Sequence, residues 1–193
     1  MRVAFVGRFE ARKGYEVAAR AICALLAQVK DVECIFVGGV VDRAVAAKLR
    51  RLGYGALFTD RRVIFKGLLS RSDLDDLYAS TDIVLMPSRY ESFGLVAIEA
   101  MAAGSVPICF AVGGLKEVVV DGQNGVLVAP GDDAAYCDKL IDLARDGKRL
   151  SRLSRGARVS FEEKYTVEIM AQMIEADLRT AYDKGVKRLV AVS

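Results

Sequence analysis

Six short, almost continuously apolar runs alternate along the chain with longer segments in which apolar residues recur every three or four positions. The apolar runs are residues 2–7, 33–38, 62–67, 82–87, 106–110 and 125–130. Strands without polar alternation are typical of a parallel sheet that is covered on both faces. The segment between the first two runs has one apolar helical face, made by Ile22, Leu25, Leu26 and Val29. The pattern therefore predicts an α/β fold: a doubly wound, mostly parallel, six-stranded Rossmann-like sheet.

After residue 147 the pattern is that of helices only. The last amphipathic run carries an apolar stripe, which consists of Met170, Ile174, Leu178 and Tyr182. No stretch has the composition of a linker, a repeat or a low-complexity segment. We therefore expect a single domain over residues 1–193, with a βα core at residues 1–147 and a helical extension at residues 148–193.

Composition narrows the class of protein. With 193 residues, 53% of them hydrophobic and 27% charged, the chain can bury the core of an ordinary folded domain. A net charge of +3 is too weak a field to indicate nucleic acid as the partner, so any anion site must be local. The four cysteines lack C-x-x-C spacing, and the chain has neither a signal-peptide core nor a run of about 18 apolar residues. We expect free thiols and a cytoplasmic location.

The loop after the first strand, residues 7–14, carries cations at the carboxyl edge of the sheet, where doubly wound folds bind ligands. Arg8, Arg12 and Lys13 stand between two glycines and just before a helix, an arrangement that suits an anion. The loop lacks the G-x-G-x-x-G of dinucleotide sites, and the chain contains no Walker motif. Taken alone, the loop is equally consistent with a βα turn whose basic side chains are solvated.

A second loop, after the fourth strand, leads into a helix that we expect to begin at Phe93 or Gly94 and to end at Gly104. The free N–H groups at its start would face the same crevice as the basic loop. Inside this otherwise apolar helix stands Glu99, and Glu91 precedes it by eight positions. Because a buried, unpaired charge costs several kcal/mol, Glu99 must either be paired or bind something.

Several motifs together resemble one family. The stretch "ESFGLVAIE" from Glu91 to Glu99 resembles the E-x7-E motif of glycosyltransferase family 4, the retaining sugar-nucleotide transferases of GT-B fold. "VGRFEARKG" is similar to the phosphate loop of that family, and "VIFKGLLSRSDLDDLYASTDIVLMPS" to its base-side loop with the following helix and strand. "GGLKEVVVDGQNGVLVAPGD" is similar to its G-G-[IL]-P-E-V-V…G-x-x-G-x-L-V-x-P-G-D stretch. The resemblance runs from about residue 3 to residue 182.

The resemblance implies a set of roles. Arg8 and Lys13 would hold the diphosphate, and Glu99 would accept hydrogen bonds from the ribose hydroxyls. Glu91, with the amides of Phe93, Gly94 and Leu95, would hold the donor sugar and its phosphate. The implied catalytic residues are Arg8, Lys13 and Glu91. The implied donor-binding residues are Gly7, Arg8, Lys13, Leu68, Glu91, Ser92, Phe93, Gly94, Leu95 and Glu99.

Two positions depart from the family pattern. Lys116 replaces the usual proline of the G-G-[IL]-P-E segment, and the loop after the second strand reads "GGVVDR". The chain also matches only the C-terminal, donor-binding half of a GT-B enzyme. The N-terminal acceptor-binding domain or subunit is therefore the expected partner, and we expect no glycosyl transfer without it. The absence of histidine fits a half that positions the donor and leaves such groups to its partner.

Two further patterns have ordinary explanations beside functional ones. Asp73 and Asp75 form a D-x-D that could bind a metal, but Ser72 is a natural N-cap and acidic residues favour a first helical turn, so we expect no metal and no cofactor. Residues 148–158 carry four arginines three positions apart, Arg149, Arg152, Arg155 and Arg158. They predict a solvated helix face, with contact to the inner face of an anionic membrane as the alternative.

Three functions remain open at this point. The first is donor binding within a retaining, metal-independent transferase that moves a hexosyl group from a UDP- or GDP-sugar to a saccharide or a lipid-linked acceptor. The second is a nucleotide-sugar-binding or regulatory module without turnover. The third is a GT-B nucleotide-sugar epimerase.

Overall fold

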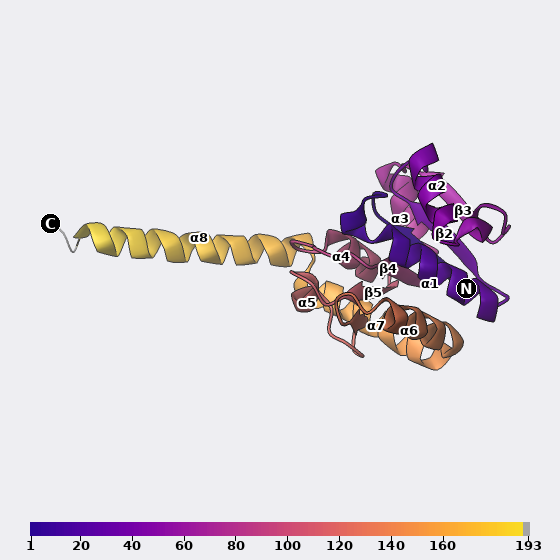
Figure 1. Ribbon diagram of the computed structural model, residues 1–193. Coiled ribbons are helices and arrows are strands. Elements are labelled where there is room, and N and C mark those ends of the chain that lie inside the picture. The colour runs from indigo at the N-terminus through magenta and orange to yellow at the C-terminus, as the bar shows by residue number, and fades with distance from the viewer. Residues whose placement is uncertain (191–193) are drawn as a thin grey trace.

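A six-stranded, all-parallel sheet lies at the centre of the protein (Figure 1). The computed structural model describes residues 1–190, except for the side chains at 177, 181 and 183–190. The strands are β1 (Arg2–Val6), β2 (Glu33–Val37), β3 (Val63–Gly67), β4 (Ile83–Met86), β5 (Val106–Phe110) and β6 (Val126–Val128). Their order across the sheet is β3-β2-β1-β4-β5-β6. The predicted doubly wound sheet is thus confirmed, and no strand end differs from its predicted position by more than two residues.

Helices cover both faces of the sheet, as the continuously apolar strands require. They are η1 (Ala11–Lys13), α1 (Tyr15–Gln28), α2 (Arg43–Arg51), η2 (Gly55–Phe58), α3 (Arg71–Ala79), α4 (Leu95–Ala102), α5 (Leu115–Val118), α6 (Asp133–Arg145), α7 (Gly147–Lys164) and α8 (Val167–Val190). Helices α1 and α6 pack side by side on one face. Helices α3, α4 and α7 cover the other.

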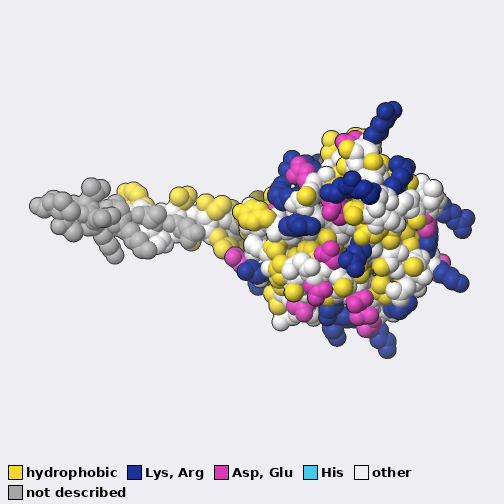
Figure 2. Space-filling model, in the orientation of Figure 1, with side chains coloured by type: hydrophobic (Ala, Val, Ile, Leu, Met, Phe, Trp, Pro, Cys, Tyr) yellow, Lys and Arg dark blue, Asp and Glu magenta, His cyan; other side chains and the backbone are white. Residues whose placement is uncertain are grey.

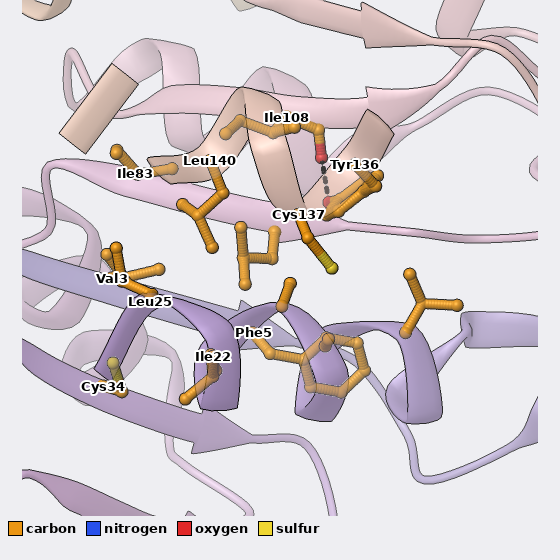
Figure 3. Close-up of a cluster of buried hydrophobic side chains, with 14 of the residues drawn as sticks. Val3, Phe5, Ile22, Leu25, Cys34, Ile83, Ile108, Tyr136, Cys137 and Leu140 are labelled. Atoms are coloured by element: carbon orange, nitrogen blue, oxygen red, sulfur yellow. Dashed lines mark hydrogen bonds between the residues drawn. The ribbon is translucent and has the colours of Figure 1, made fainter. Parts of the chain in front are cut away.

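The core under α1 and α6 is the larger of the two (Figure 3). Phe5 of β1, Ile22 of α1 and Leu140 of α6 are at most 1% exposed, so each contributes about 1.5–3 kcal/mol through burial. Tyr136 is fully buried in the same cluster, where its hydroxyl accepts from Met86 N at 3.0 Å and donates to Ile108 O at 2.6 Å. Burial raises the pKa of Tyr136 well above its ordinary value, so the hydroxyl keeps its proton and pins β4 to β5.

Helix α7 is part of the core of the other face. Its buried residue Leu153 belongs to the core under α1 and α6, and its buried residue Ala157 belongs to the core on the opposite face. The helix also packs along α4. The side chain of Arg158 donates to the carbonyl oxygen of Ala102 at the end of α4 and pairs with Glu162 at 2.6 Å. The first part of the predicted helical extension therefore belongs to the folded body.

The predicted basic face of α7 is divided in the structure. A spacing of three residues turns about 300° around a helix, so arginines at this spacing drift around the axis by about 60° at each step. Arg149 and Arg158 consequently lie on opposite sides of α7, and Arg158 is bound to α4. Arg152, Arg155 and Arg158 are exposed, whereas Arg149 is half-buried.

Helix α8 extends away from the sheet (Figure 1). The predicted apolar stripe lies on this helix, but its side chains are exposed, from 37% for Met170 to 72% for Tyr182 (Figure 2). None of the helices that the structure describes is long and apolar enough to cross a membrane.

Candidate functional site

Two loops meet at the carboxyl edge of the sheet, where the strand order changes direction between β1 and β4. The first loop connects β1 to α1, and the second connects β4 to α4. Arg89 N donates to Arg12 O at 2.8 Å, which ties the loops together. Gly14, at φ 68°, lies so close to the second loop that a Cβ would stand 1.9 Å from Pro87 O. The predicted convergence of the two loops is therefore present in the structure.

An ion pair between these loops is largely buried. Lys13 Nζ lies 2.5 Å from Glu91 Oε2, and the two side chains are 17% and 14% exposed. Lys13 is the last residue of η1 and directly precedes Gly14, the N-cap of α1. Each charge compensates the other where water reaches neither freely, so neither residue could be lost alone without leaving a poorly solvated charge.

The loop that carries Glu91 is held from its other side by two glycines. Gly114 N donates to Glu91 O at 3.1 Å. A Cβ on Gly113 would stand 1.9 Å from Glu91 O, and one on Gly114 would stand 2.6 Å from Ser92 O. Only glycine permits this approach, which explains why the segment "GGLKE" follows β5.

Helix α4 begins at Leu95 with Gly94 as its N-cap, one residue after the predicted start, and ends at Ala102. Gly104, at φ 79°, stands just beyond that end, as predicted. Ala97 N and Ile98 N both donate to Gly94 O. The N–H groups that precede them therefore have no place in the helical ladder and face outward at the start of α4. Exposed side chains surround this helix start: Ser92, Phe93 and Leu95.

Glu99, the carboxylate inside the apolar helix, has two partners on α3. Its Oε1 accepts from Arg71 at 2.6 Å, and its Oε2 accepts from the hydroxyl of Tyr78 at 3.1 Å. Glu99 is 23% exposed, so the carboxylate is paired and still reaches the surface. Sequence reasoning missed both partners, although their spacing of seven residues places them on one face of a helix.

A cavity of about 380 Å³ adjoins this group between α3, α4 and the end of α7. Arg71, Tyr78 and Glu99 line its polar side, and Phe161 and Tyr165 line its apolar side. Burial, followed by the nearby Glu99 charge, raises the pKa of Tyr78 above its ordinary range. The Tyr78 hydroxyl therefore keeps its proton at neutral pH and donates it to Glu99.

The remaining predicted site residues lie around the same edge. Arg8 is 64% exposed and pairs with Glu10 at 2.9 Å. Gly7 N donates to Val37 O at 2.9 Å, which fixes the start of the basic loop. Leu68 directly follows β3 and is 77% exposed. Lys116, which replaces the usual proline, lies exposed on the short α5.

The D-x-D aspartates take part in ordinary helix contacts. Ser70 is the N-cap of α3, where its hydroxyl accepts from Asp73 N, so the predicted cap at Ser72 is wrong by two residues. Asp73 accepts from the Ser70 hydroxyl at 2.6 Å, and Asp75 pairs with Arg71 at 3.0 Å. Over the residues that the structure describes, no three carboxylate or thiol side chains gather into a group that could hold a metal ion.

The sequence of this chain is similar to those of known glycosyl transferases. A family profile described as "Glycosyl transferases group 1" matches residues 2–160. The D-inositol 3-phosphate glycosyltransferase of Xylanimonas cellulosilytica is 37% identical over 174 residues, which are 90% of this chain and 41% of that protein. The protein of the same name from Mycolicibacterium vanbaalenii is 36% identical, over 87% of this chain and 39% of its own. The chain thus spans about two fifths of the length of these curated relatives.

Solved structures of other proteins have folds similar to that of this chain. The C-terminal domain of a group 1 family glycosyl transferase (LpcC) from Francisella tularensis is 27% identical with a TM-score of 0.75, over 86% of each chain. Anabaena HepE, solved in complex with UDP-glucose, is 25% identical with a TM-score of 0.78, over 93% of this chain and 48% of that one.

Proposed function

This chain belongs to the group 1 glycosyl transferases, and we propose that it forms the part of such an enzyme that binds the nucleotide-sugar donor. The family predicted from the motifs is confirmed, as is the likeness of the fold to a GT-B C-terminal domain. Donor binding is proposed because the chain covers about half of HepE, whose structure holds UDP-glucose.

The observation that carries the proposal is the buried Lys13–Glu91 pair where the two loops meet. Glycosyl transfer breaks the bond between the anomeric carbon and the β-phosphate, so negative charge grows on the departing diphosphate. A cation and free N–H groups that are fixed beside the departing diphosphate stabilise the transition state more than the ground state. Lys13 supplies the cation from the loop after β1, and the start of α4 supplies the free N–H groups beside it.

Each site residue then has a role. Lys13, Arg8 and the N–H groups at the start of α4 hold the diphosphate, and Arg8 is exposed enough to turn from Glu10 toward it. Glu91, held in place by Lys13, accepts hydrogen bonds from the donor sugar. Glu99 accepts from the ribose diol, because a carboxylate offers lone pairs to two hydroxyls at once.

We further propose that the transfer is retaining and needs no metal ion. Lys13 and Arg8 place positive charge where metal-dependent transferases use a divalent cation. The acceptor, a saccharide or a lipid-linked sugar, would bind to the portion of the enzyme that lies outside this chain. UDP is the first nucleotide to test, in view of the HepE complex.

Calorimetric titration of the chain with UDP, GDP and ADP, and with their sugar conjugates, tests donor binding. We expect one diphosphate to bind at micromolar concentration, with the same dissociation constant in EDTA. If none of the six ligands binds, the proposed function is wrong. A strict requirement for Mg²⁺ or Mn²⁺ would contradict metal independence and would direct attention back to Asp73 and Asp75.

A transfer assay with radiolabelled donor separates the enzyme from a binding module. The donor-bound chain should transfer sugar only when it is part of a protein that also contains an acceptor-binding half, because that half completes the reaction geometry. Binding without transfer in any such protein would favour the regulatory module. Conversion of the donor without an acceptor would favour the epimerase.

A further inference from the structure

One face of α3 presents two hydrogen-bond donors to a single carboxylate of α4. Arg71 and Tyr78 are separated by seven residues, about two helical turns, so their side chains leave α3 in the same direction. Both reach Glu99, one at each carboxylate oxygen, at 2.6 Å and 3.1 Å. The orientation of Glu99 is therefore set from α3 at two points.

The two donors differ in how firmly they are held. Tyr78 is 1% exposed and packs in the core under α4, so its side chain is held in place by its neighbours. The side chain of Arg71 is 66% exposed and divides its guanidinium between Glu99 and Asp75. Tyr78 thus fixes one oxygen of Glu99, while Arg71 restrains the other from the surface.

Glu99 keeps hydrogen-bonding capacity for a ligand. A carboxylate has about four acceptor positions, and the two donors from α3 occupy two of them. Without Arg71, the exposed oxygen would be free to rotate away from the ligand, since only the bond from Tyr78 would remain.

We propose, on the basis of the donor-binding function above, that Arg71 is a positioning residue that holds Glu99 toward the ribose diol and so sets a preference for ribonucleotides over 2′-deoxyribonucleotides. Arg71 acts through Glu99 and makes no bond to the ligand itself.

A direct contact between Arg71 and the diphosphate is disfavoured by charge. The guanidinium lies 2.6 Å from Glu99 and 3.0 Å from Asp75, so two carboxylates surround one cation. The local charge of this group is negative, and a diphosphate approaching it would be repelled. The role of Arg71 therefore lies in orienting Glu99.

Three ligands separate these roles: UDP, 2′-deoxy-UDP and inorganic pyrophosphate, titrated by calorimetry into the wild-type chain and into Arg71→Ala. We expect Arg71→Ala to weaken UDP about threefold to tenfold, and to leave pyrophosphate unchanged. The ratio of the 2′-deoxy-UDP dissociation constant to that of UDP should fall toward one. Arg71→Lys should restore part of the ratio, and Arg152→Ala, on the exposed face of α7, should leave all three constants as they are.

Two outcomes would overturn the inference. An unchanged ratio in Arg71→Ala would show that Glu99 is oriented without Arg71. Equal weakening of all three ligands would show that Arg71 binds the phosphates or supports the fold, and a thermal denaturation curve of the variant would tell these apart. GDP and 2′-deoxy-GDP are run in parallel, so that the choice of base does not decide the result.

Failure of the proposed function looks different in the same experiment. If the wild-type chain binds neither nucleotides nor pyrophosphate, donor binding is wrong and the inference falls with it. If the wild type binds pyrophosphate and UDP but also binds 2′-deoxy-UDP equally well, donor binding stands and the role of Glu99 at the ribose is wrong.

Discussion

The ammonium group of Lys13 lies 2.5 Å from the carboxylate of Glu91, although 78 positions separate the two residues in the chain. The pair joins the loop after β1 to the loop after β4, and less than a fifth of either side chain is exposed. Neither loop could shift without separating the two charges. The pair is therefore both a structural clamp and the centre of the proposed donor site.

Replacing Lys13 should reduce binding of a nucleoside diphosphate more than replacing its neighbour. Lys13→Met removes the buried cation, and we expect the dissociation constant to rise about tenfold or more, because a charge-assisted bond to phosphate contributes about 1.5–3 kcal/mol. Arg12→Met removes an exposed cation of the same loop and should change binding by less than about threefold. Equal effects in both variants, measured by calorimetry, would place the anion elsewhere.

Adding a methyl group at Gly113 should displace the Glu91 loop. In Gly113→Ala the new Cβ would meet Glu91 O at 1.9 Å, so we expect a loss of about 1–3 kcal/mol of stability and weaker diphosphate binding. Gly122→Ala is the matched control, because Gly122 also has a positive φ but has no atom within 4 Å of the added Cβ. If both variants unfold at the same denaturant concentration, the close approach of Gly113 to Glu91 does not contribute to stability.

Removing the hydroxyl group of Tyr136 should weaken the contact between β4 and β5. Tyr136→Phe leaves Met86 N and Ile108 O without their buried partner, and we expect the free energy of unfolding to fall by about 1–3 kcal/mol. Tyr90→Phe serves as the control, since Tyr90 is 59% exposed. Urea denaturation measures both, and a Tyr136→Phe variant as stable as the control would contradict the role of the hydroxyl.

Acid should remove the contribution of Asp60. Hydrogen bonds from the side chain and backbone of Arg62 lower the pKa of Asp60 to about 2, whereas in the unfolded chain a pKa of about 3.9 is expected. A lowered folded-state pKa adds stability that is fully present above about pH 4 and is lost as the pH falls to about 2.

Thermal denaturation of Asp60→Asn as a function of pH tests this contribution. The variant should melt below the wild type at pH 7, and the two curves should approach each other between about pH 4 and pH 2. Arg62 also donates to Leu26 O and Val29 O near the end of α1, so the loss of Asp60 should loosen that helix end. A difference in melting temperature that stays constant down to pH 2 would contradict the assignment. Asp138→Asn, on the exposed side of α6, is the control.

The strands and the two converging loops could be predicted because local chemistry determines them. A run such as "VPICF" is apolar at every position, which a parallel strand buried on both faces requires, and β5 occupies these residues. Gly94 and Gly104 mark the two ends of α4 because both adopt left-handed conformations that other residues rarely take. Each of these signals lies within a few residues of the structure that it predicts.

Pairings between distant elements could not be read in the same way. Nothing near Glu99 in the chain identifies Arg71 and Tyr78 as its partners, because α3 and α4 come into contact only when the strands between them join the sheet. The misplaced cap shows a smaller version of the problem, since Ser70 and Ser72 are chemically equal candidates. The first turn of α3 begins at Arg71 and so selects Ser70. The spacing of the α7 arginines was regular in the chain, but the helical repeat distributes them around the axis.

The strand order has a consequence for the way the chain folds. Strands β1, β2 and β3 form one side of the sheet from consecutive segments, whereas β4, β5 and β6 form the other side and join it only along β1. Contacts within each side close shorter loops than the contact of β1 with β4, so the join is expected to form last. Lys13 follows β1 and Glu91 follows β4, one on each side of that join. Their ion pair would therefore form only at the end of folding, and a chain halted at either half-sheet would carry each charge without its partner.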